Sequence, residues 1–118
     1  MKLSEHFDDS EFACHHCHCL PHGGMDGELV QLLEAIRELS GSMPMTIMSG
    51  YRCPVHNKAV GGAKSSQHML GTAADIRIPG LSPKQVAGFA EKLIPNKGGI
   101  GIYPTFTHVD VRRNKARW

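Results

Sequence analysis

The chain has 118 residues, a length typical of one domain, because two cores within it would each be marginal. A composition of 41% hydrophobic and 20% charged residues excludes whole-chain disorder and coiled coil. The net charge of +2 is too small to indicate a nucleic-acid-binding surface, and no apolar run approaches the ~20 residues that span a bilayer. Eight histidines and four cysteines are the unusual feature, and they favour metal chemistry.

The start of the chain contains one lysine but no apolar stretch after it, so the sequence predicts no secretory signal peptide. We therefore expect synthesis in the cytoplasm. Residues 1–24 are rich in Cys, His and Gly and are predicted to form an irregular segment of the single domain 1–118.

A helix is predicted over residues 28–39, because its apolar residues recur at the spacing of one buried face. These residues are Leu29, Leu32, Leu33 and Ile36. Gly41 and Pro44 end the helix, and residues 45–49 are predicted to form a short strand.

Residues 51–72 are expected to be mostly loop, and residues 73–78 to be a strand. A capping box at Ser82 with Pro83 at the first helical position begins a second helix. Its expected buried face is Val86, Phe89, Ala90 and Leu93. Residues 99–103 and 107–112 are two further strands. Two main helices and about four strands in irregular order predict an α+β fold with a mostly antiparallel sheet.

The strongest chemical signal is His68 followed seven positions later by Asp75, with His108 in a later strand. Two histidines and one carboxylate are the donor set of a catalytic zinc, which leaves the fourth position for water. Gly71 permits a sharp turn between the first two, and an unpaired Asp75 in an apolar strand would be costly. The spacing alone equally allows a loop histidine and a satisfied strand carboxylate.

Short motifs follow one another along nearly the whole chain. They are Ser49-Gly50-Tyr51-Arg52-Cys53-Pro54, His56-Asn57, Gly61-Gly62, Ser66-Gln67-His68, Gly71, Ala73-Ala74-Asp75, Gly99-Ile100-Gly101, His108-Val109-Asp110 and Ala116-Arg117-Trp118. In this order they resemble the zinc D-Ala-D-Ala carboxypeptidase family, most closely its small phage and bacterial branch of murein peptidases. The resemblance implies a hedgehog/DD-peptidase-like fold and hydrolysis of peptidoglycan stem peptides or cross-links.

The resemblance also implies roles for single residues. His68, Asp75 and His108 match the zinc ligands. Arg52 matches an active-site arginine that steadies a substrate carbonyl or carboxylate, and the alternative is that it pairs with an acid and holds its loop. Ser66 and Gln67 are expected to contact the substrate or to support the ligands.

The general base is the point at which this sequence departs from part of the family. Many relatives carry an acid three residues before the last zinc histidine, where this chain has Thr105. Asp110 is the one carboxylate side chain after Glu91, and it shares a strand face with His108. We expect Asp110 to take the proton. The alternative is that it orients His108 or pairs with Arg112.

Cys14, Cys17 and Cys19 form a Cys-x-x-Cys-x-Cys run with interleaved histidines, and Cys53 is the fourth cysteine. In a reducing cytosol such a run more often holds metal than disulfides, and four thiolates would make a closed structural zinc site. Disulfides in an oxidising wall environment, or no role, are the alternatives.

We interpret the chain as a monomeric zinc metallopeptidase that acts on peptidoglycan and has no membrane partner. A phage or prophage endolysin, released through a membrane pore, would explain the expected lack of a signal peptide. A non-catalytic zinc-binding recognition module of the same fold is the alternative. A nucleic-acid-binding Cys/His module is disfavoured by the low charge and the 6% aromatic content. The sequence leaves open which peptide bond is cleaved.

Overall fold

The computed structural model describes residues 1–118. Its elements are η1 (Asp9–Phe12), α1 (Gly27–Leu39), β1 (Thr46–Ser49), α2 (Pro54–Ala59), η2 (Gln67–Leu70), β2 (Ala73–Arg77), α3 (Pro83–Leu93), β3 (Gly99–Ile102), β4 (Thr107–Asp110) and β5 (Ala116–Arg117). The predicted α+β class is confirmed, and the two predicted helices correspond to α1 and α3.

The five strands form one sheet in the order β1-β2-β4-β3-β5. Neighbouring strands are antiparallel except for β3 and β5, which are parallel. Because β2 and β4 are neighbours at the centre, residues far apart in the sequence meet there. The mostly antiparallel sheet was expected, whereas the fifth strand was not.

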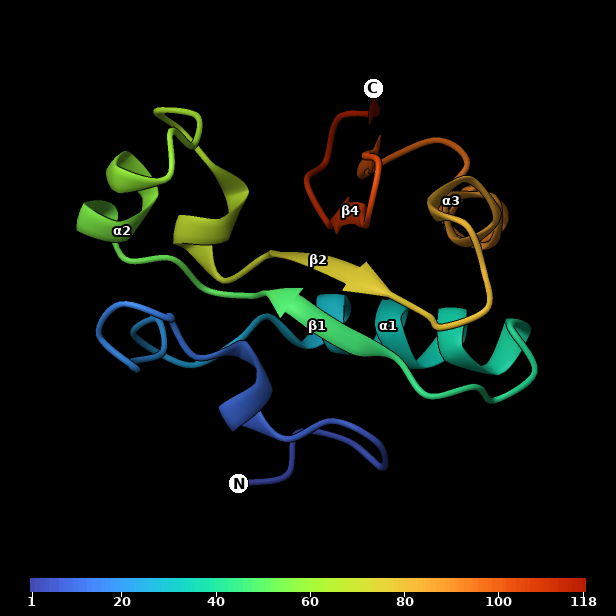
Figure 1. Cartoon of the computed structure of the whole chain (residues 1–118), viewed down its shortest axis with the longest axis horizontal. Coiled ribbons are helices and arrows are strands. Elements are labelled where there is room, and N and C mark those ends of the chain that lie inside the picture. The colour runs from blue at the N-terminus through green and yellow to red at the C-terminus, as the bar shows by residue number, and fades with distance from the viewer.

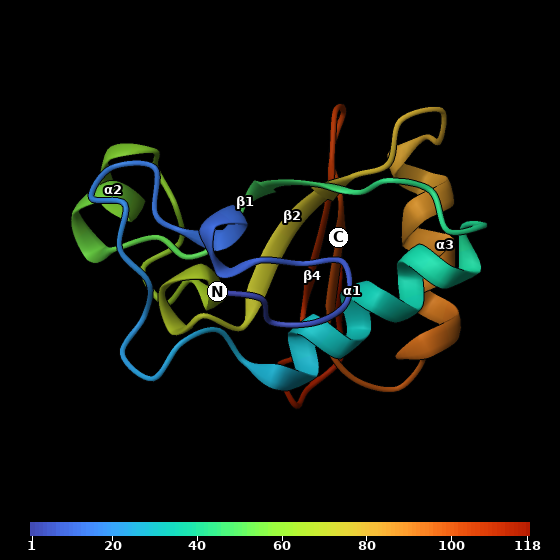
Figure 2. The same ribbon diagram turned by 90° about the horizontal axis from the view of Figure 1, so that it is seen from below.

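One face of the sheet packs on the hydrophobic core, and the other carries the polar candidate residues. Successive side chains of a strand point to opposite faces. Ala74 and Ile76 of β2 and Val109 of β4 belong to the hydrophobic core. Helices α1 and α3 pack against each other, and α3 packs on β3 and β4, at this face (Figures 1 and 2). Asp75 and His108, at the alternate positions, therefore lie on the opposite face.

Helix α1 begins after Asp26, whose carboxylate accepts the N–H groups of Glu28 and Leu29. Its predicted buried face is confirmed, because all four expected residues are buried. In α3 the predicted capping box is present and Val86 is buried. Leu93 was expected in the core but is 36% exposed, and Ala87 is buried in addition. Phe89 is partly buried against the core, and Ile94 at the C-cap is buried in place of Leu93.

The N-terminal segment is mostly irregular, as expected, but it contributes to the core. Phe7 and Phe12 are buried and meet edge to face, with ring centroids 6.2 Å apart. The N–H of Tyr51 donates to the carbonyl of Phe12, at 2.8 Å. The segment is therefore joined to the chain that follows β1.

Residues 51–72 are more ordered than predicted, since they contain α2 and η2. The Sγ atom of Cys53 accepts the N–H of His56, and Pro54 occupies the first turn of α2. A helix of six residues is too short to display an apolar period, and the expectation of a loop was wrong here. Figure 1 shows α2 at the end of the molecule away from α3. None of the helices combines the length and hydrophobicity that a bilayer crossing needs.

Candidate metal centre

The fold brings His68, Asp75 and His108 together from three elements. His68 lies on η2, which ends at Gly71 in the left-handed conformation with φ of 74°. A side chain at that φ would be strained, so glycine permits the turn that returns the chain to β2. Asp75 and His108 are direct partners in the antiparallel pairing of β2 with β4.

One carboxylate oxygen lies at the centre of the cluster. Oδ1 of Asp75 is 3.2 Å from Nε2 of His68 and 3.0 Å from Nδ1 of His108. These donor atoms lie within 4.8 Å of one another. All three residues are buried, with exposed fractions of 3–7%. The cluster therefore has the compactness of one metal site.

The second nitrogen of each imidazole identifies the tautomer. Nδ1 of His68 lies 2.7 Å from the carbonyl oxygen of Gly50, which can only accept, so Nδ1 carries a proton. Nε2 of His108 lies 2.8 Å from Oδ2 of Asp110 and donates to that carboxylate. Neutral imidazoles held in this way aim lone pairs, from Nε2 of His68 and Nδ1 of His108, at Asp75.

Without a metal, these short contacts are hydrogen bonds only when the imidazole nitrogens that face Asp75 carry protons, and a bound cation would take the place of those protons. Burial opposes ionisation of Asp75, but hydrogen bonds with His108 and His68 lower its pKa to about 2. Burial likewise disfavours a charged His108, yet its contacts with Asp110 and Asp75 raise its pKa. The site thus offers two nitrogen donors and one oxygen donor around a point where positive charge is favoured. This donor set fits a zinc ion.

Arg52 lies beside the same cluster. Its Nη2 is 3.4 Å from Oδ2 of Asp75, and its Nη1 donates to Oδ1 of Asn57 at 3.1 Å. Asn57 is buried and its Nδ2 donates to the carbonyl of Ala63 at 2.9 Å. The amide thus fixes the guanidinium and the loop after α2 together. No sequence expectation singled out Asn57 for this role, although Pro54 at the start of α2 could have indicated its helix.

A cleft of about 650 Å³ opens over the cluster and Arg52. Its lining includes three aromatic side chains, Tyr103, Phe106 and Trp118, and the imidazoles of His15 and His56. Asp75 is the one carboxylate in the lining. Histidine and aromatic residues that the sequence analysis had given no role therefore form much of the cleft.

Ser66 and Gln67 both line the cleft. The hydroxyl oxygen of Ser66 accepts the N–H of His68 at 3.2 Å, which supports the turn that carries this residue. Oε1 of Gln67 accepts the hydroxyl of Thr72 at 2.9 Å. Its amide N–H groups have no partner in the chain and can donate into the cleft.

Asp110 was expected to take the proton in the reaction, but its side chain is buried beneath the cleft surface rather than exposed to it. It is 0% exposed and does not line the cleft. Its Oδ1 accepts from the backbone N–H groups of Gly99 and Arg112 and from Nε of Arg112. Its Oδ2 accepts from Nη2 of Arg112 and from His108. Burial opposes ionisation, but these donors hold the pKa of Asp110 far below its usual range.

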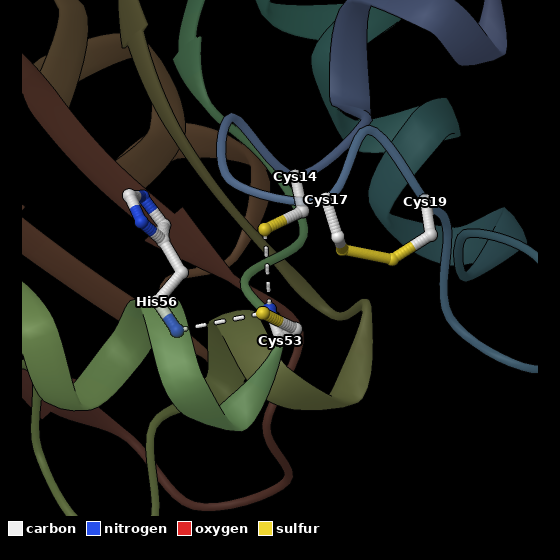
Figure 3. Close-up of a disulfide and its surroundings, with 5 residues drawn as sticks. All are labelled: Cys14, Cys17, Cys19, Cys53 and His56. Carbon is white, nitrogen blue, oxygen red and sulfur yellow. Dashed lines mark hydrogen bonds between the residues drawn. A yellow bond between two sulfur atoms is a disulfide. The ribbon is translucent and has the colours of Figure 1, made fainter.

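The four cysteines lie together beside the start of α2, where the N–H of His56 donates to Sγ of Cys53 (Figure 3). Cys17 and Cys19 form a disulfide, and Cys14 and Cys53 are free. Burial opposes ionisation of Cys14, but backbone N–H groups, first that of Cys53, donate to its sulfur and lower its pKa. The fold thus brings Cys53 into contact with Cys14 of the N-terminal segment, although the two are 39 residues apart in the sequence.

Comparison with known proteins agrees with this geometry. The peptidase M15 family model matches residues 5–110. The chain is 37% identical over 95 residues to a probable peptidoglycan L,D-endopeptidase MepK of Haemophilus influenzae, covering 73% of this chain and 50% of that protein. It is 33% identical over 94 residues to the peptidoglycan L,D-endopeptidase MepK of Escherichia coli K12, with the same coverage.

A shorter match joins the chain to the zinc D-Ala-D-Ala carboxypeptidase of Streptomyces albus G. The two are 46% identical over 44 residues, which is 37% of this chain and 17% of that protein. The chain spans about half the length of the MepK proteins that it matches.

Proposed function

Because the chain belongs to the peptidase M15 family, we propose that it is a zinc-dependent peptidase that hydrolyses peptide bonds of peptidoglycan. The observation that carries the proposal is the convergence of two lone pairs and one carboxylate oxygen at His68, Asp75 and His108. Such a donor set leaves a coordination position for the reacting groups. The names of the matched relatives supply the substrate class.

We propose that the zinc is held by Nε2 of His68, Oδ1 of Asp75 and Nδ1 of His108. Zinc bound there would polarise a scissile carbonyl and activate water for attack. Arg52, with its guanidinium fixed by Asn57, is placed to hold a substrate carbonyl or carboxylate and to offset negative charge that develops. Gln67 can donate to the peptide backbone, while Ser66 lines the cleft and supports the turn of His68.

Of the two roles expected for Asp110, we propose the positioning one. Its oxygens are occupied by five hydrogen bonds and its side chain does not reach the cleft. By accepting the proton of Nε2, it holds His108 in the tautomer that presents Nδ1 to the metal. The proton acceptor of the reaction must then be another group that lines the cleft, and the imidazoles of His15 and His56 are available there.

We propose further that the protein acts as a monomer, since the residues of a single chain suffice to form the cleft and the candidate ligand set. We also propose that it reaches the cell wall after release from the cytoplasm, as a phage or prophage lysis enzyme would. The structural metal expected of the cysteines would take no part in this chemistry, because no cysteine lines the cleft.

The test combines metal analysis with hydrolysis of purified peptidoglycan. In protein prepared without reductant, which keeps the Cys17–Cys19 disulfide, His68→Ala removes one of three ligands and should abolish both the tightly bound zinc and the release of peptide products. His22→Ala, at an exposed histidine of the N-terminal segment, should change neither. Mass spectrometry of the wild-type products identifies the bond cleaved. Bound zinc without hydrolysis would instead support the non-catalytic recognition module.

A further inference from the structure

Three sulfur atoms converge in a cluster that the proposed reaction does not use. The Sγ atoms of Cys14, Cys17 and Cys53 lie within 4.8 Å of one another. Two belong to the N-terminal segment and the third immediately precedes α2, 39 residues beyond Cys14 (Figure 3). Sulfur atoms brought together from distant segments are typical of a metal site or a disulfide, and Cys14 and Cys53 form no disulfide.

Backbone N–H groups point at two of these sulfur atoms. The N–H of Cys53 donates to Sγ of Cys14 at 3.5 Å, and the N–H of His56 donates to Sγ of Cys53 at 3.4 Å (Figure 3). Donors of this kind stabilise a thiolate relative to a thiol. The thiolate is the form of cysteine that binds metals. The backbone is therefore arranged for ligands at both positions.

The fourth sulfur atom is held nearby by the turn of residues 14–19. The N–H of Cys14 donates to the carbonyl of Cys19 at 2.9 Å, and the N–H of His18 donates to the carbonyl of Cys14 at 2.7 Å. Cys19 is bonded to Cys17, so cleavage of that bond would free two sulfur atoms beside Cys14. Four thiolates are the donor set of a closed structural zinc site.

We propose that Cys14, Cys17, Cys19 and Cys53 form a structural zinc site in the reduced protein. A dithiol reductant gives two electrons and two protons to the Cys17–Cys19 bond and becomes a disulfide itself. Each cysteine thiol then releases its proton as its sulfur binds zinc. The disulfide and the four-sulfur site exclude each other, so the oxidised protein lacks this metal.

The site would fix one side of the cleft. Cys14 precedes His15, and Cys53 lies between Arg52 and the helix that carries His56; all three neighbours line the cleft. Zinc would thus join the N-terminal turn to the segment that bears the arginine. This inference does not rest on the proposed reaction, because no step of that reaction passes through the cysteines.

The experiment uses the His68→Ala chain, in which only the cysteine site should bind metal tightly. The reduced chain is titrated with Co²⁺, and the near-ultraviolet sulfur-to-cobalt charge-transfer absorption is followed. We expect one tightly bound equivalent with this absorption, its loss in a Cys53→Ser background, and its retention when His16 is replaced by alanine. Without reductant the absorption should be absent.

A second measurement avoids variants that could fail to fold. In the reduced wild-type chain, zinc should slow alkylation of all four cysteines, as read by mass spectrometry. The proposal is overturned if the reduced His68→Ala chain binds no tight Co²⁺, if its spectrum lacks the sulfur band, or if zinc leaves the alkylation rates unchanged. None of these readouts depends on peptidase activity, so they separate this proposal from the peptidase proposal.

Discussion

Replacement of Asp110 by asparagine tests how His108 is held. The carboxylate accepts the His108 proton and one Arg112 N–H on Oδ2, and three further N–H groups on Oδ1. If the asparagine oxygen keeps the three donors, its NH₂ group must face the other two. His108 can escape this clash by moving its proton to Nδ1. That tautomer points N–H, in place of a lone pair, at the metal position.

The expected magnitude follows from the contacts that are lost. Loss of a hydrogen-bonding partner behind a ligating histidine typically weakens metal binding about 10–100-fold, which is about 1.4–2.8 kcal/mol. The new NH₂ group at position 110 faces other donors at a fully buried position, and an unsatisfied buried donor costs about 1–3 kcal/mol of folding stability. We therefore expect weaker zinc binding and lower stability together, with activity partly restored by excess zinc.

The assay is competition for zinc between the protein and a coloured chelator, with hydrolysis measured at saturating zinc. Thr105→Ala is the matched control, because Thr105 is exposed and lies on the turn just before β4. It should bind zinc as the wild type does. If Asp110→Asn keeps wild-type zinc affinity while kcat falls about 10²–10⁴-fold and the acidic limb of the pH–rate profile disappears, Asp110 is the general base and the positioning argument fails.

Three further predictions concern other parts of the molecule. Gly62→Ala would place Cβ 2.1 Å from Oδ1 of Asn57 and 2.7 Å from Nη1 of Arg52. Because this displaces the guanidinium, kcat/KM should fall about 10²-fold while bound zinc is retained. Unchanged kinetics would contradict the role of Asn57 in positioning Arg52. Gly88→Ala, on α3 with no atom within 4 Å of the added Cβ, should raise the free energy of unfolding by about 1 kcal/mol in urea titrations, and a loss would refute it. Burial opposes ionisation of Glu34, but hydrogen bonds from the N-terminal segment outweigh it and lower the pKa of this carboxyl. Its contribution to the free energy of unfolding is therefore complete above pH ~4.3 and is lost as the pH falls through the lowered pKa. Glu34→Gln should remove this part of the acid dependence of unfolding, and an unchanged pH profile would refute the prediction.

Long periodic segments were predictable from the sequence because their signals are redundant. In α1 four apolar residues share one face and Asp26 caps the helix, so each signal supports the other. The start of α3 was equally clear from Ser82 and Pro83. The strand containing His108 ends sooner than expected, at Asp110, because Arg112 folds back to donate to that carboxylate.

Short elements and contacts between distant residues could not be predicted from the sequence. Helix α2 depends on Cys53 and Pro54 rather than on an apolar period, and β5 has two residues that pair with β3. The expected metal ligands do converge, but their spacing could not show which nitrogen of each histidine is free. That choice depends on Gly50 and Asp110, whose contacts with His68 and His108 exist only in the folded chain.

The pairing of Asp75 with His108 across two neighbouring strands has a consequence for biosynthesis. The two residues are 33 positions apart, and α3 and β3 are made between them. Strand pairing over such a separation must wait until the later strand has left the ribosome, and it forms slowly compared with local contacts. A nascent or prematurely terminated chain that stops before β4 would hold His68 and Asp75 but no complete set of metal donors. Truncated products of translation should therefore be inert towards the wall, whatever metal the cell supplies.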